Sequence, residues 1–262
     1  MKTELLEGNV IHADETVVQV LREPGKKAKT DSRMWVYCSG KYEKYRNILF
    51  EYQPTRNGNH AKRFLGNFSG YLVCDGFDGY NKLDAVKRWG CFAHVRRKFV
   101  DTLPLDEAAI ETSVSAVGVA WCNKIFMIER EMADLPFEER AIKRQEQMKP
   151  ALDGFFAWIE TVTAAGGTKL AKAIQYAKNE KKYLYTFLDH PDAPIDNNRA
   201  ENAIRPFCLG RKNWLFSTST KGVEARAIIY SVAATACANG LNMEEYFANV
   251  FKANGRDLIM PR

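Results

Sequence analysis

Residues 10–20 constrain the fold of this chain more than any other stretch. Their sequence, Val-Ile-His-Ala-Asp-Glu-Thr-Val-Val-Gln-Val, is rich in β-branched residues and predicts an extended strand. Because successive side chains of a strand point to opposite faces, Asp14 shares one face with Thr16, while Glu15 lies on the other. A shift of the register by one residue would exchange the two acids, so Glu15 is the alternative to Asp14. His12 and Thr16 on the same face favour Asp14 as the residue of a polar cleft.

Two further strands are predicted at residues 34–38 and 47–52, which combine β-branched and aromatic residues. Pro54 stops the second one, because proline cannot donate a ladder hydrogen bond. The connections are short, so the three strands are expected to form an antiparallel meander. A short helix is predicted at residues 59–65.

An apolar run at residues 71–74 ends abruptly in Asp75 and a glycine. This pattern is typical of a buried strand whose last residue projects into a cleft at the carboxyl edge of a sheet. Asp78 is the competing acid, but the Asp-Gly pair that it begins is typical of a turn. The pattern therefore favours Asp75.

The chain changes character after this strand. A helix is predicted at residues 80–89 and a short buried strand at residues 90–93. From residue 106 to residue 188 the sequence is rich in Ala, Glu, Lys and Met, with helical periodicity. Breaks at residues 135–136 and 164–167 divide this region into three or four predicted helices.

Residues 196–206, Asp-Asn-Asn-Arg-Ala-Glu-Asn-Ala-Ile-Arg-Pro, predict the start of a helix, because Asp and Asn cap helix N-termini. Glu201 falls in the first turn, and Arg205 lies one turn beyond it. An acid at this position can stabilise the helix dipole or pair with Arg205, and the local pattern alone favours such a structural role. It can also be a fixed oxygen ligand for a hard cation, which requires partner carboxylates elsewhere in the chain.

The order of these elements predicts an α/β fold, a ribonuclease-H-like mixed sheet flanked by helices, with an all-helical insertion before Glu201. The predicted domains are residues 1–104, the first part of the core with both aspartates, residues 105–190, the helical insertion, and residues 191–262, the second part of the core with the terminal helices. In this layout three different elements each bring one acid to one cleft.

Such a cleft, lined by Asp14, Asp75 and Glu201, would carry roughly the charge needed to hold two divalent ions about 3.5–4 Å apart. Mg²⁺, or Mn²⁺ in its place, suits a site of this kind, because it prefers a few carboxylates together with water and phosphate oxygens.

The formal net charge of +6 is compatible with a nucleic-acid partner. Residues 82–98 contain six basic residues and one acid, and such a run is either a solvated helix face or a track for a phosphate backbone. His94 either contacts a phosphate or a carboxylate, or is a satisfied histidine at a strand–helix junction. The candidate DNA contacts are His94, Arg96, Arg97, Lys98, Arg205, Arg211 and Lys212.

Six cysteines are scattered without a CxxC pair, so reduced thiols in the core are predicted. Cys91 and His94 have a spacing that could begin a zinc site, but no second pair with metal-ligand spacing follows, so zinc is not expected. No signal peptide opens the chain and no apolar run is long enough to span a bilayer, so we expect a cytoplasmic protein.

Five blocks of the sequence, in this order, carry a resemblance to a known family. They are residues 12–16 (His-Ala-Asp-Glu-Thr), 75–81 (Asp-Gly-Phe-Asp-Gly-Tyr-Asn), 91–99 (Cys-Phe-Ala-His-Val-Arg-Arg-Lys-Phe), 197–206 (Asn-Asn-Arg-Ala-Glu-Asn-Ala-Ile-Arg-Pro) and 210–214 (Gly-Arg-Lys-Asn-Trp). Together they resemble the transposases of the insertion sequence 66 family over most of the chain.

This resemblance implies a DDE-type transposase core with Asp14, Asp75 and Glu201 as the acidic triad and two Mg²⁺ or Mn²⁺ ions. It implies DNA cleavage at insertion-sequence ends and strand transfer to target DNA by one site, through phosphodiester hydrolysis and transesterification. The expected partners are transposon-end and target DNA. The expected active assembly is a homodimer or higher oligomer in the bacterial cytoplasm.

Members of the family look roughly twice as long, with an upstream region that carries coiled-coil, zinc-binding and DNA-end-binding segments. The chain is therefore expected to be a truncated reading frame or an excised catalytic fragment. Two alternatives remain open. One is a metal-dependent nuclease of the same fold, which cuts without joining, and the other is a truncated, non-catalytic DNA-binding or regulatory fragment.

Overall fold

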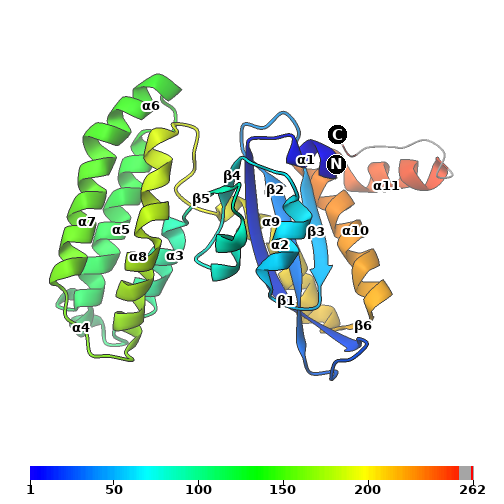
Figure 1. Ribbon diagram of the computed structural model, residues 1–262, viewed down its shortest axis with the longest axis horizontal. Coiled ribbons are helices and arrows are strands. Elements are labelled where there is room, and N and C mark those ends of the chain that lie inside the picture. Colours follow the sequence, from blue (N-terminus) through cyan, green and yellow to red (C-terminus); the bar gives the residue numbers. More distant parts are fainter. Residues whose placement is uncertain (254–260, 262) are drawn as a thin grey trace. The chain divides into compact units, whose positions relative to one another are not determined.

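The structure, a computed structural model, describes residues 1–253 and residue 261 (Figure 1). Residues 254–260 and 262, which belong to the predicted second part of the core, lie outside the described residues. The chain folds as two compact units. The first unit consists of Met1–Leu72, Phe77–Lys87 and the described residues from Asn198 onward, and the second consists of Val73–Gly76 and Arg88–Asn197.

The first unit is built on an antiparallel meander. β1 (Val10–Arg22) pairs with β2 (Asp31–Ser39), and β2 pairs with β3 (Ile48–Gln53). In the β1–β2 register Asp14 lies opposite Val36. β2 begins ahead of its predicted start at residue 34, because the ladder with β1 extends that far. The three predicted strands and their antiparallel pairing are confirmed.

Shorter strands complete the sheet. The strand order is β3-β2-β1-β4-β5, where β4 is Tyr71–Val73 and β5 is Lys87–Trp89. β6 (Ser217–Ser219), which no sequence pattern indicated, pairs in parallel with β1. The fold is therefore a mixed sheet flanked by helices, and the predicted ribonuclease-H-like class is confirmed.

Two long helices, α9 (Asn198–Trp214) and α10 (Thr220–Ala238), cover one face of the meander (Figure 1). Phe207 of α9 and Val18 of β1 are fully buried in the core between them. Because side chains alternate along β1, the face that carries Val18 also carries Asp14. The α9 face of the sheet is thus the face of the predicted acid.

The opposite face of the meander is covered by α2 (Gly58–Leu65), the helix predicted at residues 59–65. The ring of Tyr37 stacks on that of Phe64, with the two centroids 3.8 Å apart. α1 (Lys2–Leu6) and α11 (Met243–Lys252) complete the described helices of the first unit.

The predicted helix at residues 80–89 is wrong. The chain forms a short 3₁₀ helix (Asp78–Lys82) and then enters β5. The amide N–H groups of Tyr80, Leu83 and Val86 each donate to a carbonyl three residues earlier. Such a succession of tight turns places apolar residues at helix-like spacing without making α-helical hydrogen bonds.

The predicted strand at residues 90–93 is also wrong. β5 ends at Trp89, and α3 (Phe92–Val100) begins within the predicted strand. The N–H of Gly90 donates to a carbonyl of α8, and the N–H of Phe92 donates to Ile195 O at 2.8 Å. These amides therefore bond to other segments of the second unit rather than to a neighbouring strand.

The second unit is a bundle of helices. In chain order it contains α3, α4 (Glu107–Glu111), α5 (Val114–Glu131), α6 (Phe137–Lys143), a π-helical turn (Arg144–Met148), α7 (Lys149–Thr161), α8 (Lys169–Tyr185) and a 3₁₀ turn (Thr186–Asp189). Residues 106–188, all of them described, contribute no strand. The predicted breaks at residues 135–136 and 164–167 coincide with the α5–α6 and α7–α8 connections.

α3 belongs to this bundle. The ring centroids of Phe92 and Phe99 lie 5.6 and 6.1 Å from that of Phe155 on α7. Such edge-on aromatic contacts stabilise a core beyond their buried area. The domain boundaries given above stay a prediction, while the compact units themselves divide at Arg88 and Asn197.

The two ends of the bundle are tied to each other. Besides the bond from Phe92, the N–H of Asn197 donates to Cys91 Sγ at 3.1 Å. Arg144, which is fully buried, donates to His190 O at 2.6 Å and so holds the returning segment against the π-helical turn. The excursion of about a hundred residues thus begins and ends at one place.

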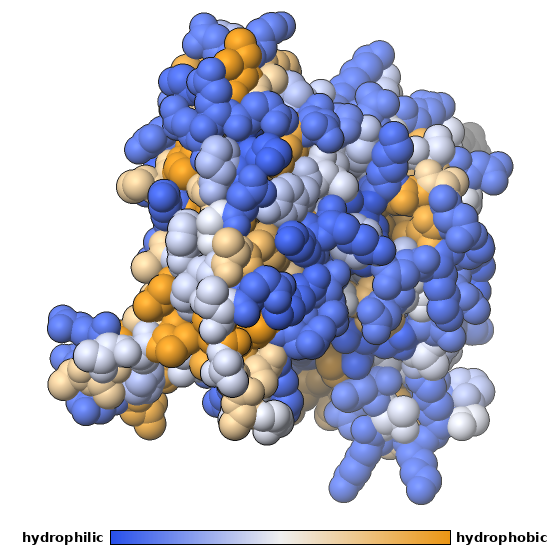
Figure 2. Space-filling model, turned by 60° about the vertical axis from the view of Figure 1, so that its left-hand side comes forward, coloured by the Kyte–Doolittle hydropathy of each residue, from blue (hydrophilic) through white to orange (hydrophobic). Residues whose placement is uncertain are grey.

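The surface is mostly polar. On the face drawn in Figure 2, hydrophilic side chains predominate and hydrophobic ones form smaller patches. Ile228 and Ile229 of α10 are among the exposed apolar residues, at 65% and 57%. No helix among the described residues is both long and apolar enough to cross a membrane.

Candidate active site

Asp14 and Glu15 occupy opposite faces of β1 and have different surroundings. Asp14 is half-buried, and its Oδ1 accepts a hydrogen bond from the N–H of Glu15 at 2.8 Å. The Glu15 side chain is only 3% exposed and is paired with Arg56, while Tyr80 OH donates to it at 3.2 Å. The register therefore assigns Glu15 to a structural ion pair and leaves Asp14 as the acid on the α9 face.

α9 runs alongside β1 on this face. Near its start, Arg199 donates to Ser39 O at the end of β2, which lies opposite Ile11. Near its end, Arg211 donates to Thr16 Oγ1 at 2.9 Å and also to the carbonyl of Val17. The helix thus follows β1 in the same direction past Asp14.

Glu201 lies in the first turn of α9 and is half-buried. The preceding Ala200 and the following Ile204 are buried against the sheet, which fixes the rotation of the helix. The Asp14 side chain therefore lies on the side of the meander that α9, the helix of Glu201, covers. Both acids belong to the first unit.

Asp75 belongs to the second unit and lies two residues beyond the end of β4. It is half-buried, and its carbonyl accepts a hydrogen bond from Arg88 Nη2 at 2.8 Å. Asp78, the competing acid, is exposed and opens the 3₁₀ helix, as its turn pattern predicts. The meeting of Asp14, Asp75 and Glu201 in one cleft stays a prediction.

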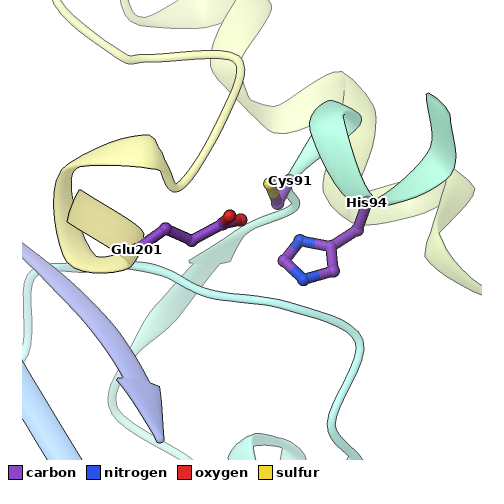
Figure 3. A group of neighbouring side chains, drawn as sticks. All are labelled: Cys91, His94 and Glu201. Carbon is purple, nitrogen blue, oxygen red and sulfur yellow. The ribbon is translucent and has the colours of Figure 1, made fainter. Parts of the chain in front are cut away.

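Two further candidates lie at the start of α3. Cys91 is the buried N-cap residue and His94 lies in the first turn, as Figure 3 shows; Figure 3 also draws Glu201 on the first turn of α9. The Cys91 sulfur and a ring nitrogen of His94 are within 4.8 Å of each other. His94 Nε2 lies 3.4 Å from Arg97 Nη1, so the histidine has a polar contact on its own helix.

The predicted DNA contacts fall into two groups. Arg96 donates to Asn123 Oδ1 at 2.7 Å, and Arg211 donates a hydrogen bond to β1. Both guanidinium groups therefore make hydrogen bonds within the protein. Lys98 is exposed and its Nζ lies 5.6 Å from the centre of the Tyr176 ring. Arg97, Arg205 and Lys212 are exposed. For both groups, contact with DNA stays a prediction.

The cysteines are free, and four of the six are buried, which agrees with reduced core thiols. Burial raises the pKa of Cys38 and of Cys74 to about 12. Cys38 is the neighbour of His12 across the β1–β2 ladder, and Cys74 precedes Asp75. Both thiols therefore stay protonated near neutral pH.

The side chains that hold the Asp75 segment were not found from the sequence. They are Arg88 and, on α8, Tyr176 and Glu180. Tyr176 and Glu180 follow Asp75 by about a hundred residues and sit among lysines and alanines in a pattern typical of a solvated helix. No local signal distinguishes them.

The chain is similar to a family of known proteins and to several individual relatives. The family described as "Transposase IS66 family" matches residues 1–225. Two relatives are uncharacterized proteins of Sinorhizobium fredii (strain NBRC 101917 / NGR234). The protein y4hP is 25% identical over 94% of this chain and 49% of its own length, and y4qI is 29% identical over 90% and 46%. The chain spans about half the length of these relatives.

One solved structure, the Drosophila P element transposase strand transfer complex, is similar with a TM-score of 0.47 and 11% identity. The similarity covers 87% of this chain and 77% of that one.

Proposed function

The chain belongs to the IS66 family of transposases, and on this premise we propose that it is a catalytic region that cleaves DNA at insertion-sequence ends and joins those ends to target DNA. The observation that carries the proposal is the family match over residues 1–225, which spans all three predicted acids. The setting of Asp14 supports it, because this acid is half-buried on the α9 face while its neighbour Glu15 is committed to an ion pair.

Asp14, Asp75 and Glu201 are the proposed catalytic triad and the proposed ligands of two Mg²⁺ or Mn²⁺ ions. The donor set fits such ions, because all three side chains offer carboxylate oxygens and are half-buried. When bound, the ions would activate a water or DNA hydroxyl as nucleophile and stabilise the departing oxygen of the phosphodiester.

The remaining proposed roles concern DNA. His94, Arg97, Lys98, Arg205 and Lys212 would contact the phosphate backbone, and Arg96 and Arg211 would do so in addition to their bonds within the fold. The proposed substrates are transposon-end and target DNA. The proposed assembly is a homodimer or higher oligomer, acting in the bacterial cytoplasm.

A strand-transfer assay tests the proposal. The chain is incubated in Mg²⁺ or Mn²⁺ with a labelled duplex that carries the element's own terminal sequence and a free 3′-hydroxyl, together with a supercoiled plasmid. We expect labelled, joined plasmid from the wild type and none from Asp14→Asn or Glu201→Gln. Both substitutions nearly keep the size of the side chain and remove its charge, so circular dichroism should be unchanged.

Two outcomes would favour the alternatives. Cleavage of the end duplex without joined plasmid would indicate a metal-dependent nuclease of the same fold. Binding of the duplex with neither cleavage nor joining would indicate a regulatory DNA-binding fragment.

A further inference from the structure

The peptide group between Asp75 and Gly76 is held at both of its polar ends by side chains of the second unit, the buried Arg88 and the half-buried Tyr176. Its carbonyl, on Asp75, accepts a hydrogen bond from Arg88 Nη2 at 2.8 Å. Its N–H, on Gly76, donates to Tyr176 OH at 3.1 Å. With both ends bonded to side chains, the plane of this peptide cannot rotate without breaking a hydrogen bond.

Arg88 is itself held in place. Its Nη2 donates to Glu180 Oε2 at 3.1 Å, and the side chains of the pair are only 4% and 7% exposed. The guanidinium carbon also lies 3.9 Å from the centre of the Tyr183 ring. Tyr176, Glu180 and Tyr183 recur at one-turn spacing on α8, so one face of one helix provides the support.

The close packing around residue 76 leaves no room for a Cβ atom, so glycine is required there. A Cβ atom at this position would lie 2.6 Å from Tyr176 Cε2 and 3.1 Å from the Glu180 carboxyl carbon. The ring carbon belongs to a side chain that is packed and hydrogen-bonded, so it cannot move aside cheaply. Glycine thus allows α8 to approach the peptide closely enough to bond it.

The sheet alone does not fix Asp75. β4 ends at Val73, and the N–H of Cys74 donates to Trp89 O at 3.2 Å. The direction in which the Asp75 side chain leaves the backbone therefore depends on the peptide that follows it. A carboxylate that binds a cation must be held within about 0.5 Å of its working position.

We propose that Arg88, Tyr176 and Glu180 are positioning residues, which clamp the Asp75–Gly76 peptide and so set the direction of the Asp75 carboxylate. This inference rests on the proposed function of Asp75. It gives the helical unit a part in the reaction, because α8 supplies two of the three residues. Burial, together with the charges of Glu180 and Asp75, raises the pKa of Tyr176, so its hydroxyl remains neutral and able to serve the Gly76 N–H.

The test compares Tyr176→Phe with Tyr185→Phe in the full chain. Both substitutions remove one hydroxyl from α8, but Tyr185 OH donates to Asp153 Oδ1 at 2.8 Å, away from the clamp. Hydrogen exchange of the Gly76 amide, followed by ¹⁵N NMR, should become at least about tenfold faster in Tyr176→Phe only. The kcat of strand transfer should fall by about 10–100-fold, with the KM for DNA unchanged, because a displacement near 1 Å costs that much.

A second pair of variants separates positioning from stability. Glu180→Gln keeps the size of the side chain but removes the charge that orients Arg88, and Glu129→Gln does the same at the Arg144–Glu129 pair of the same unit. We expect the two variants to lose a similar amount of Tm. The Mn²⁺ affinity, measured by calorimetry, should be about tenfold lower in Glu180→Gln than in Glu129→Gln.

The outcomes are distinguishable. A Gly76 amide that exchanges as slowly in Tyr176→Phe as in the wild type would overturn the clamp. The clamp would also be overturned if the Gly76 amide exchanged faster while kcat and Mn²⁺ affinity stayed equal to those of the control variants. A wild-type chain that neither binds Mn²⁺ nor joins DNA would instead overturn the proposed function of Asp75.

Discussion

At the scale of single residues, the pair Asp14 and Glu15 illustrates how register decides chemistry. The two carboxylates are adjacent in the chain, and Glu15 is paired with the guanidinium of Arg56 on the α2 side of the sheet. Glu15 also accepts a hydrogen bond from the hydroxyl of Tyr80. A buried acid with these partners contributes to folding, whereas its neighbour Asp14 lies on the α9 face and is the proposed catalytic acid.

Substituting the two acids separately tests this division. Asp14→Asn should abolish strand transfer and leave the free energy of unfolding within about 0.5 kcal/mol of the wild type. Glu15→Gln should lower that free energy by about 1–3 kcal/mol, because it breaks a buried charge-assisted bond, and should retain strand transfer. Urea unfolding and the plasmid assay measure the two effects. The reverse pattern would mean that Glu15 is the reacting acid.

The exposed cations give a second prediction at this scale. Arg97→Ala should weaken binding to every duplex by a similar factor and flatten the plot of log affinity against log salt by about one unit. Lys178→Ala is the matched control, because Lys178 lies in the same unit but is paired with Glu160. Fluorescence anisotropy on two unrelated duplexes at several salt concentrations provides the slopes. Unchanged slopes in Arg97, Lys98, Arg205 and Lys212 variants would remove these residues from the DNA-binding surface.

At the scale of elements, the attachment of α9 to β1 is the feature that sets the position of Glu201. Arg211 spans the two elements by donating to Thr16 and to the carbonyl of Val17. Arg211 is also a predicted DNA contact. Its bonds to β1 add a structural role that no local sequence pattern indicates. Its partners lie almost two hundred residues earlier in the chain.

Arg211→Ala should therefore destabilise the protein. We expect the free energy of unfolding to fall by about 1.5–3 kcal/mol, the contribution of hydrogen bonds to a charged group. Lys212→Ala, the exposed neighbour, should change it by less than about 0.5 kcal/mol. Urea denaturation followed by circular dichroism compares the two. Equal stability of the two variants would refute a structural role for Arg211.

The elements that could be predicted are those whose signal is local. β1, β2 and β3 alternate over many residues, and α9 begins with capping residues, so their positions follow from short stretches of sequence. Residues 80–93 could not be predicted, because three consecutive tight turns imitate helical spacing. The support of Asp75 by α8 could not be predicted either, since it depends on tertiary contacts between distant segments.

At the scale of the whole molecule, each acid belongs to a unit with its own core, and the chain spans about half the length of its relatives. The proposed binding of ions by the three carboxylates can be measured without DNA.

Divalent ions should stabilise the folded chain. At a concentration near 100 times Kd, Mn²⁺ should add about 2.7 kcal/mol and raise Tm by about 5 °C or more. Asp14→Asn should lose most of this increase, and Glu15→Gln, the control, should keep it. Scanning calorimetry with MnCl₂ and then with excess EDTA measures the shift. An increase of equal size in Asp14→Asn would contradict the assignment of Asp14 as a ligand.

The tied ends of the helical bundle have a consequence for the evolution of the chain. Hydrogen bonds join Cys91 and Phe92 at its beginning to Asn197 and Ile195 at its end. The residues between them therefore form a closed loop, whose joined ends we call the neck. A lineage can lengthen, shorten or reshape such a loop while the segment that leads into α9 starts from the same place. Insertions and deletions should therefore accumulate in the connections of the bundle distant from the neck, and α8, which bears on Asp75, should tolerate them least.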